Sequence, residues 1–178
     1  MDYPIQYTGL DFSLPLLEKG LDISQSANFH ASFQETDLID QDWDTLLQEK
    51  PYQRIFSFAV LHHIPSLENR KRFFTRIYNM LDRPGLFVFS TWQFLRSPRL
   101  VKRIQPWERI SLTGDQVESN DYLLDWRAEC QAQPLRYVHH CTLEELDELR
   151  SKTGFILVER FCSDGHTGDL SEYQIWSK

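Results

Sequence analysis

The amino-acid sequence predicts an α/β fold built on a mostly parallel β-sheet. Two observations lead to this prediction. Short apolar runs typical of buried strands alternate with amphipathic stretches typical of helices, and the connections between them are short. A strand, a helix and a second strand joined in this way form a right-handed crossover, which makes the two strands parallel. The 178 residues are enough for one domain with a sizeable core.

The first third of the chain predicts one strand–helix–strand unit. Residues 5–9 form the first predicted strand, and Ser13 can cap the helix that follows it. This helix is expected to end near Gly20, because glycine readily adopts the left-handed conformation that terminates helices. The second strand is expected at residues 28–33.

The middle of the chain begins with a short amphipathic segment. Trp43, Leu46 and Leu47 are spaced like one face of a helix that ends before Pro51. Residues 54–60, with the sequence Arg-Ile-Phe-Ser-Phe-Ala-Val, are almost continuously apolar. This pattern is typical of a strand that is covered on both faces.

A further helix and strand complete the middle of the chain. Ser66 can cap the helix, whose apolar positions recur with the period of a buried helical face. The tripeptide Arg-Pro-Gly at residues 83–85 is expected to end this helix, and residues 86–92 form the next buried strand.

The last third of the chain starts with an irregular stretch, residues 94–140, and then becomes regular again. Thr142 and Glu145 have the spacing of a capping box, and Gly154 can close the helix that they begin. Two closing strands, expected to be antiparallel to their neighbours, are predicted at residues 155–161 and 172–178.

Composition narrows the class of protein. The formal net charge of −7 disfavours a nonspecific coat for nucleic acids, but leaves room for a local basic patch. No apolar stretch approaches the roughly 20 residues that span a bilayer, and no signal peptide is recognisable. The three cysteines are odd in number and are not clustered like metal ligands, so we infer no metal site and expect a reduced, cytoplasmic setting.

Polar residues follow three of the predicted strands, where ligands bind in open parallel sheets. Asp11 follows the first strand and could accept hydrogen bonds from ribose hydroxyls, and Asp37 follows the second and could reach an adenine amino group. His62 and His63 follow the third strand. Each residue also has a structural interpretation, since a lone aspartate often caps a helix and a lone histidine often packs or faces solvent.

The chain resembles the class I S-adenosylmethionine-dependent methyltransferases. The resemblance rests on "YTGLDFSLPLLEKG", "ETDL", "IFSFAVLHHIPSLENRKRFFTRIYNMLDRPGLFVFSTW" and the two closing strands. It implies a Rossmann-like sheet and S-adenosylmethionine as the cofactor. It also implies that the ribose is held by Asp11 and the adenine by Asp37. The full set of cofactor-binding residues that it implies is Asp11, Phe12, Ser13, Asp37, Leu38, Ala59 and Val60.

The later half is similar to the methyltransferases that act on carboxymethyl groups of the tRNA wobble uridine. The segments "NDYLLDW" and "LRYVHHCTLEELDELRSKTGF" carry this similarity, although Asn120 and Asp125 depart from the pattern. The matching residues, with Trp92 added as a residue that could stack on a base, are Trp92, Asp121, Trp126, Arg136, Tyr137 and His139.

The resemblance implies two forms of catalysis. A carboxylate acceptor needs no base, so Arg136 would bind it, with His139 or His63 helping to orient it. A hydroxyl or amine acceptor would instead require His63 as the general base. A basic stripe of Arg96, Arg99, Lys102 and Arg103 could meet a tRNA backbone, or could simply be a solvated helix face. Trp92, Trp107 and Trp126 could stack on a base, but such residues more often close a core or a lid.

The resembled family also has a first strand and a glycine-rich turn that should precede Tyr7. The seven glycines of this chain form no Gly-x-Gly pattern, so we expect residues 1–178 to be a single, N-terminally truncated domain with residues 94–140 as a substrate-side insertion. Such a gap would expose sheet edges that could pair two copies into a homodimer. A non-catalytic scaffold that has lost cofactor binding is the alternative function, while a nucleotide-dependent dehydrogenase is disfavoured because it too would need the glycine-rich turn.

Overall fold

The structure is a computed structural model that describes residues 5–27, 29–45, 47, 51–125 and 134–178. It divides into two compact units, Met1–Gln48 and Glu49–Lys178. None of the helices in these ranges is both long and apolar enough to cross a membrane.

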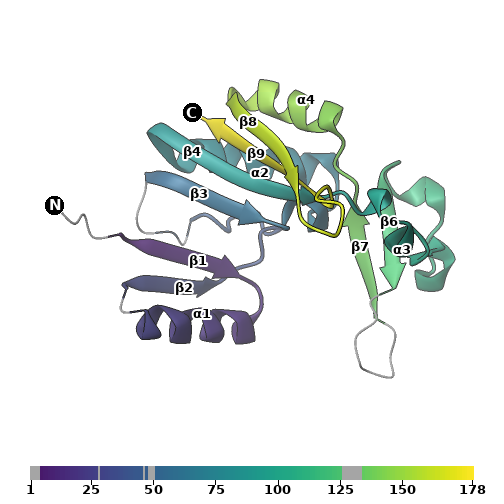
Figure 1. Ribbon diagram of the computed structural model, residues 1–178, viewed down its shortest axis with the longest axis horizontal. Helices are drawn as coiled ribbons and strands as arrows, with labels where there is room; N and C mark the ends of the chain where they lie inside the picture. The colour runs from purple at the N-terminus through teal and green to yellow at the C-terminus, as the bar shows by residue number, and fades with distance from the viewer. Residues whose placement is uncertain (1–4, 28, 46, 48–50, 126–133) are drawn as a thin grey trace. The chain divides into compact units, whose positions relative to one another are not determined.

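The first unit is a parallel strand–helix–strand element, as predicted (Figure 1). Strand β1 (Tyr7–Asp11) and strand β2 (Ala31–Glu35) pair in parallel, and helix α1 (Leu14–Ser26) connects them. The register places Asp11 beside Glu35 at the carboxyl end of this two-stranded sheet. The first unit therefore brings two acidic side chains to one edge.

The prediction that the first helix ends at Gly20 is wrong, because α1 continues through this residue. A Cβ atom at Gly20 would lie 2.6 Å from the Phe33 ring, and one at Gly9 would lie 2.7 Å from the same ring. Such separations are far below van der Waals contact. Gly20 therefore makes room for Phe33 between α1 and the sheet rather than ending the helix.

The short helix expected around Trp43 is also not formed in the described part of this segment. Residues 38–45 adopt successive turns, with i to i+3 hydrogen bonds from Asp40 N–H to the Asp37 carbonyl and from Thr45 N–H to the Asp42 carbonyl. Aspartate competes for backbone hydrogen bonds and favours turns over helix interiors. Leu46 lies outside the described residues.

The second unit contains a four-stranded sheet in the order β3-β4-β9-β8. Strands β3 (Tyr52–Phe58) and β4 (Leu81–Trp92) are parallel, while β9 (Ser171–Ser177) is antiparallel to both β4 and β8 (Ile156–Ser163). The antiparallel closing pair is confirmed. Within the described chain β3 has a strand partner only on its β4 side, and dimerisation through such an edge stays a prediction.

Helix α2 (Leu67–Met80) packs an aromatic face against this sheet. Phe74 stacks on Trp176 with ring centroids 4.9 Å apart and meets the ring of Phe89 edge-on at 5.6 Å. Ser66 caps the helix as predicted, accepting a hydrogen bond from the Asn69 N–H. Helix α4 (Leu143–Thr153) lies beside α2 and ends at Gly154, which has the expected positive φ.

Strand β4 begins five residues earlier than predicted. The tripeptide Arg-Pro-Gly lies within β4 rather than between the helix and the strand, since Leu81 is already extended and pairs with Tyr52 of β3. A register shift between Tyr52 and Arg54 accommodates the extra residues. Proline is tolerated here because it falls in this irregular stretch of the ladder.

Residues 94–140 are more regular than the sequence indicated. They include an antiparallel sheet in the order β5-β6-β7, and its small core contains Phe94, Leu100, Leu124 and Val138. The elements of this region are η2 (Phe94–Arg96), α3 (Pro98–Val101), β5 (Ile104–Gln105), η3 (Trp107–Ile110), η4 (Gly114–Gln116), β6 (Asp121–Asp125) and β7 (Leu135–His139). A single-turn helix, η1 (Leu61–His63), follows β3.

Replacing Phe74 with alanine should lower the free energy of unfolding of the second unit by about 3–5 kcal/mol, because it leaves a cavity among packed rings. Urea unfolding followed by tryptophan fluorescence measures the change. The matched control is Phe161→Ala on β8, where the ring is 42% exposed and stacks on Tyr173, so a loss of about 1 kcal/mol is expected. Equal losses in the two variants would contradict this account of the core.

Candidate functional site

The first unit carries an acidic cavity at the carboxyl end of its strands. The Asp11 Oδ1 atom accepts the Ser13 N–H at 2.8 Å, which starts helix α1. Ser13 occupies the N-cap position as predicted, but its hydroxyl forms no capping bond. No described residue bonds to the other carboxylate oxygen of Asp11, so that oxygen can accept a hydrogen bond from a ligand.

The cavity has a volume of about 670 Å³, within the range of small-molecule sites. Phe12 and Asp37, both predicted to bind the cofactor, line it. Asp11, Ser13 and Leu38 are near in sequence but are not part of its lining. The complete lining is Phe12, Glu35, Thr36, Asp37, Asp40, Gln41, Asp42, Trp43 and Thr45.

The chemistry of this lining suits a ligand rich in hydrogen-bond donors. Four carboxylates supply acceptors, the ring of Phe12 is 75% exposed, and Trp43 packs beneath. Hydroxyl and amino groups are recognised by such acceptors, whereas phosphates would be repelled by them. Sequence reasoning missed Glu35, Asp40 and Asp42.

The second unit carries a strained turn where β3 ends. Ala59 has a φ of +55°, which is unusual for a residue with a side chain, and its N–H donates to the Ser90 Oγ at 3.1 Å. Strain of this kind is stored where surrounding structure holds it, often at functional sites. Val60 follows and leads into η1, which presents the two predicted histidines.

His62 and His63 are fixed in opposite tautomers by backbone partners. The Trp92 N–H donates to His62 Nδ1, so the proton of this neutral ring sits on Nε2. His63 Nδ1 lies 3.1 Å from the Tyr137 carbonyl, which only accepts hydrogen bonds, so His63 carries its proton on Nδ1. The Nε2 atom of His63 has no bonding partner among the described residues and can accept a proton.

Burial keeps both rings neutral. Burial, the neighbouring His63 and the charge of Arg136 lower the pKa of His62 to about 3. The pKa of His63 is also lowered by burial and by Arg136, although the hydrogen bond to Tyr137 opposes the shift. His63 is therefore unprotonated at neutral pH, and the positive charge of Arg136 on β7 contributes to this.

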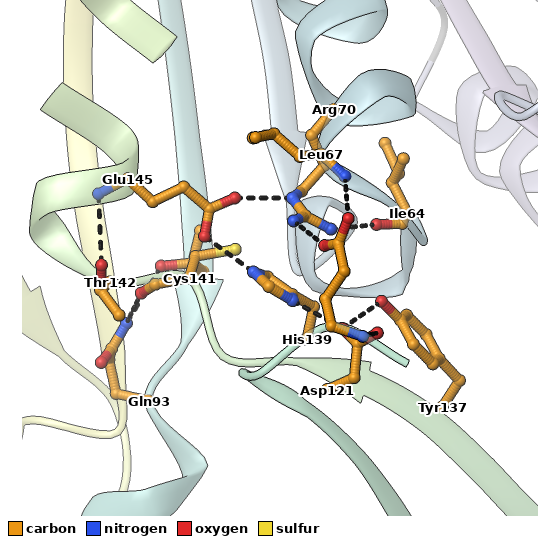
Figure 2. A network of polar contacts seen from close by, with 12 residues as sticks. Ile64, Leu67, Arg70, Gln93, Asp121, Tyr137, His139, Cys141, Thr142 and Glu145 are labelled. Carbon is orange, nitrogen blue, oxygen red and sulfur yellow. Dashed lines mark hydrogen bonds and ion pairs between the residues drawn. The ribbon is translucent and has the colours of Figure 1, made fainter. Parts of the chain in front are cut away.

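Figure 2 shows a network of charged side chains in which Arg70 and His139 are buried. Asp121 Oδ1 accepts hydrogen bonds of 2.7 Å from both the Tyr137 hydroxyl and His139 Nδ1. The other ring nitrogen of His139 donates to Glu145 Oε2, also at 2.7 Å. Glu145 in turn accepts from Arg70, so strands β6 and β7 are joined to helices α4 and α2.

Arg70 completes the network from helix α2. Its guanidinium donates to Glu145 at 2.7 Å, to Glu118 at 2.6 Å and to the carbonyl of Ile64 at 3.1 Å. Arg70 is only 1% exposed, and a charge this deeply buried requires such partners. Glu118 also accepts the N–H of Leu67, the first residue of α2.

The network holds His139 in its charged form. Burial alone would lower the pKa of His139, but the hydrogen bonds to Asp121 and Glu145 outweigh it and raise this pKa. Both ring nitrogens donate to carboxylates, which requires both to carry protons. Both ring nitrogens of His139, which was predicted to help orient the acceptor, are therefore engaged by carboxylates, and its role in catalysis stays a prediction.

These residues form an ion-pair network rather than a metal centre. Donor atoms of Glu118, Asp121 and His139 lie within 4.8 Å of one another. However, Arg70 already supplies a cation to Glu118, and a proton lies between Asp121 and His139. A metal ion would have to displace both.

Sequence reasoning missed Arg70, Glu118 and Glu145. One signal was available, since Arg70 precedes Phe73, Phe74 and Ile77 by three, four and seven residues and so shares their buried face. Glu145 was interpreted as half of a capping box. Its N–H does bond to Thr142 Oγ1 at 3.2 Å, but its carboxylate turns to Arg70 and His139 instead of returning to Thr142.

The remaining predicted residues divide between the core and the surface. Trp92 packs against His62 and Phe94, with ring centroids 5.8 Å and 5.6 Å away. Trp126 lies outside the described residues. Tyr137 is half-buried, and burial together with the bond to Asp121 raises the pKa of its hydroxyl.

The predicted basic stripe is partly used within the fold. Arg96 donates to Cys162 Sγ and to the Asp169 carbonyl, and Arg103 forms an ion pair with Asp125 at 2.8 Å. Arg99 and Lys102 are exposed. Contact of these four cations with a tRNA backbone stays a prediction.

Comparison with known proteins identifies the family. A family model described as a methyltransferase domain matches residues 2–160. The chain belongs to the methyltransferase domain family. A search of curated proteins gave no match.

Solved structures share the fold of this methyltransferase domain. An S-adenosylmethionine-dependent methyltransferase from Methanosarcina mazei has a TM-score of 0.69 and 15% identity, covering 97% of this chain and 82% of that one. One from Clostridium acetobutylicum has a TM-score of 0.67 and 10% identity, covering 97% and 83%. The 1,6-didemethyltoxoflavin-N1-methyltransferase of Burkholderia thailandensis, bound to S-adenosylhomocysteine, has a TM-score of 0.59 and 17% identity, covering 96% and 60%.

The Rossmann-like class I fold is confirmed, and S-adenosylmethionine is the cofactor. The acidic cavity of the first unit fits its adenosine part, because ribose hydroxyls and the adenine amino group are donors that match the carboxylates. When bound, the cofactor supplies an electrophilic methyl group on a positively charged sulfur.

Replacing His139 with glutamine should remove a pH-dependent part of the stability. Because folding raises the pKa of His139, its charge stabilises the fold fully below about pH 6.5, the ordinary histidine value, and this contribution is lost as pH rises through the raised pKa. We expect the variant to lose about 3 kcal/mol at pH 6 and progressively less at alkaline pH.

Urea unfolding at a series of pH values measures this difference, with the exposed His166→Gln as the control. A difference between wild type and His139→Gln that is independent of pH would show that His139 is not charged in the fold.

Proposed function

We propose that this methyltransferase domain methylates a hydroxyl or amine acceptor that loses its proton to His63. The observation that carries the proposal is the bond from His63 Nδ1 to the Tyr137 carbonyl, which keeps the proton on Nδ1 and leaves Nε2 unprotonated. A neutral hydroxyl or amine must give up a proton when its oxygen or nitrogen attacks the methyl carbon. A base with a lowered pKa is unprotonated at neutral pH and can take it.

Arg136 makes the site favour acceptors that carry a negative charge. It lies on β7 next to Tyr137. Its positive charge is one of the causes that lower the pKa values of His62 and His63. An anionic group on the acceptor would be held there by a charge-assisted hydrogen bond. Residues 94–140, which carry Arg136, would then be the substrate side of a single domain spanning residues 1–178.

Methyl transfer to a carboxylate of tRNA is the second candidate. Arg136 also suits a carboxymethyl group, and Asp121, Tyr137 and His139 occupy neighbouring positions on β6 and β7. A carboxylate is already ionised at neutral pH and needs no base. The two candidates therefore differ in whether turnover depends on His63.

The first experiment is calorimetric titration with S-adenosylmethionine, because a scaffold that has lost cofactor binding should show no heat. Methyl-labelled cofactor is then incubated with unfractionated tRNA and, separately, with a mixture of small amines and phenols. Mild alkali releases label from a methyl ester but not from a methylated amine or an ether, which separates the two candidate acceptors.

Replacing His63 with glutamine should lower turnover by about 10²–10⁴-fold while leaving the Kd for S-adenosylmethionine unchanged, because only proton transfer is lost. Turnover of the wild type should fall at acid pH as His63 gains a proton, with its midpoint below the ordinary histidine pKa. Labelled product formed at an undiminished rate by His63→Gln, and labile to alkali, would establish the carboxylate candidate instead.

Replacing Arg136 with alanine should raise the KM of an anionic acceptor by on the order of tenfold or more, since a hydrogen bond to a charged group is lost. The Kd for S-adenosylmethionine, measured by calorimetry, should change little. Arg99→Ala is the matched control, because Arg99 is exposed on α3. Loss of cofactor binding in Arg136→Ala would contradict its assignment to the acceptor.

A further inference from the structure

The charged network and His63 are connected at two points of the backbone. Tyr137, whose hydroxyl bonds to Asp121, supplies the carbonyl that accepts the proton of His63 Nδ1. Arg70 holds the carbonyl of Ile64, the residue that directly follows His63. The imidazole ring and the turn that bears it are therefore each anchored to the same group of side chains, of which Figure 2 shows Tyr137, Asp121, Ile64 and Arg70.

We propose that Asp121, His139 and Arg70 are positioning residues that hold His63 in the tautomer required of a general base. This inference rests on the proposed function of His63. His139 is the bridge, because its ring joins the carboxylate that holds Tyr137 to the carboxylate that holds Arg70. The three act on His63 through Tyr137 and through the carbonyl of Ile64.

The charges of the network explain why a protonated histidine occupies this position. Two buried cations, Arg70 and His139, contact three carboxylates, of which Asp121 and Glu145 are largely buried and Glu118 is partly exposed to water. A neutral imidazole would donate to only one carboxylate and would leave the other buried without its proton donor. Two further titratable residues follow His139 in the chain. His140 comes directly after it, and Cys141, whose thiol is buried, comes next.

The strand geometry transmits this constraint to His63. Tyr137 and His139 are two residues apart on β7, so their side chains lie on the same face of the sheet and meet the same Asp121 oxygen. Fixing these two side chains fixes the twist and position of β7 at Tyr137. The carbonyl of Tyr137 is then held at hydrogen-bond distance from His63.

The test measures the histidine rings directly and needs no acceptor. Long-range ¹⁵N–¹H correlation spectra of the uniformly ¹⁵N-labelled 178-residue chain report which nitrogens of each ring are protonated, across a pH series. In the wild type we expect His139 to carry two protons at neutral pH, His63 to be the Nδ1–H tautomer and His62 the Nε2–H tautomer.

Replacing Asp121 with asparagine should deprotonate His139 near neutral pH. It should also reduce the ratio of the Nδ1–H to the Nε2–H tautomer of His63 by about fivefold, which corresponds to the net free energy of one hydrogen bond. Tyr137→Phe removes a single hydroxyl and should shift the same ratio in the same direction. If Asp121→Asn does not fold, the tautomer ratio of His63 in Tyr137→Phe is the result that tests the proposal.

The matched control is Asp147→Asn, which breaks the surface pairs of α4 with Arg150 and Arg160 and should leave both His139 and His63 unchanged. An unaltered His63 tautomer in folded Asp121→Asn and Tyr137→Phe would overturn the proposal. If the tautomer shifts while His63→Gln keeps full turnover, the positioning of His63 holds and its role as the base fails.

Discussion

The buried imidazolium of His139 is the interaction on which the second unit depends. It connects Asp121 on β6 to Glu145 on α4, and Glu145 connects to Arg70 on α2. The apolar core of the β5-β6-β7 sheet contacts the larger sheet through Trp92 of β4, whose ring packs against Phe94. The directional charged bonds act together with this apolar contact in setting how the smaller sheet meets the helices of the larger one.

The charged groups of this network contribute more to fixing the geometry of the second unit than to its free energy of unfolding. Burying the charged groups of Arg70, His139, Asp121 and Glu145 carries a large desolvation cost, which their mutual attraction offsets only when every donor and acceptor is matched. The matching here is close, since Arg70 and His139 direct hydrogen bonds to carboxylates at 2.6–2.7 Å. A hydrophobic substitute could fill the same volume, but it could not dictate which proton sits on which nitrogen of a neighbouring ring.

Outside residues 94–140, local patterns in the sequence predicted the strands, the main helices and their order, because apolar periodicity and caps act over a few residues. The same patterns failed where a distant residue decides the outcome. Gly20 resembles a helix end until Phe33 is placed against it, and Glu145 resembles a capping residue until Arg70 and His139 compete for its carboxylate. The resemblance to methyltransferases located Asp37, Phe12 and His63 correctly at strand ends. It did not reveal that Asp121 and His139 face each other, since that contact depends on the register of β6 with β7.

Phe33 and the two glycines around it have a consequence for how the sequence can evolve. The ring occupies the space where side chains at positions 9 and 20 would project, so these three sites share one small volume. Alanine at either glycine becomes acceptable only after the ring has been replaced by something smaller, and a smaller residue leaves a void until a methyl group fills it. Each single step is unfavourable although the combined change is not. The three positions therefore constitute an epistatic unit, in which substitutions are expected to be inherited together across related chains.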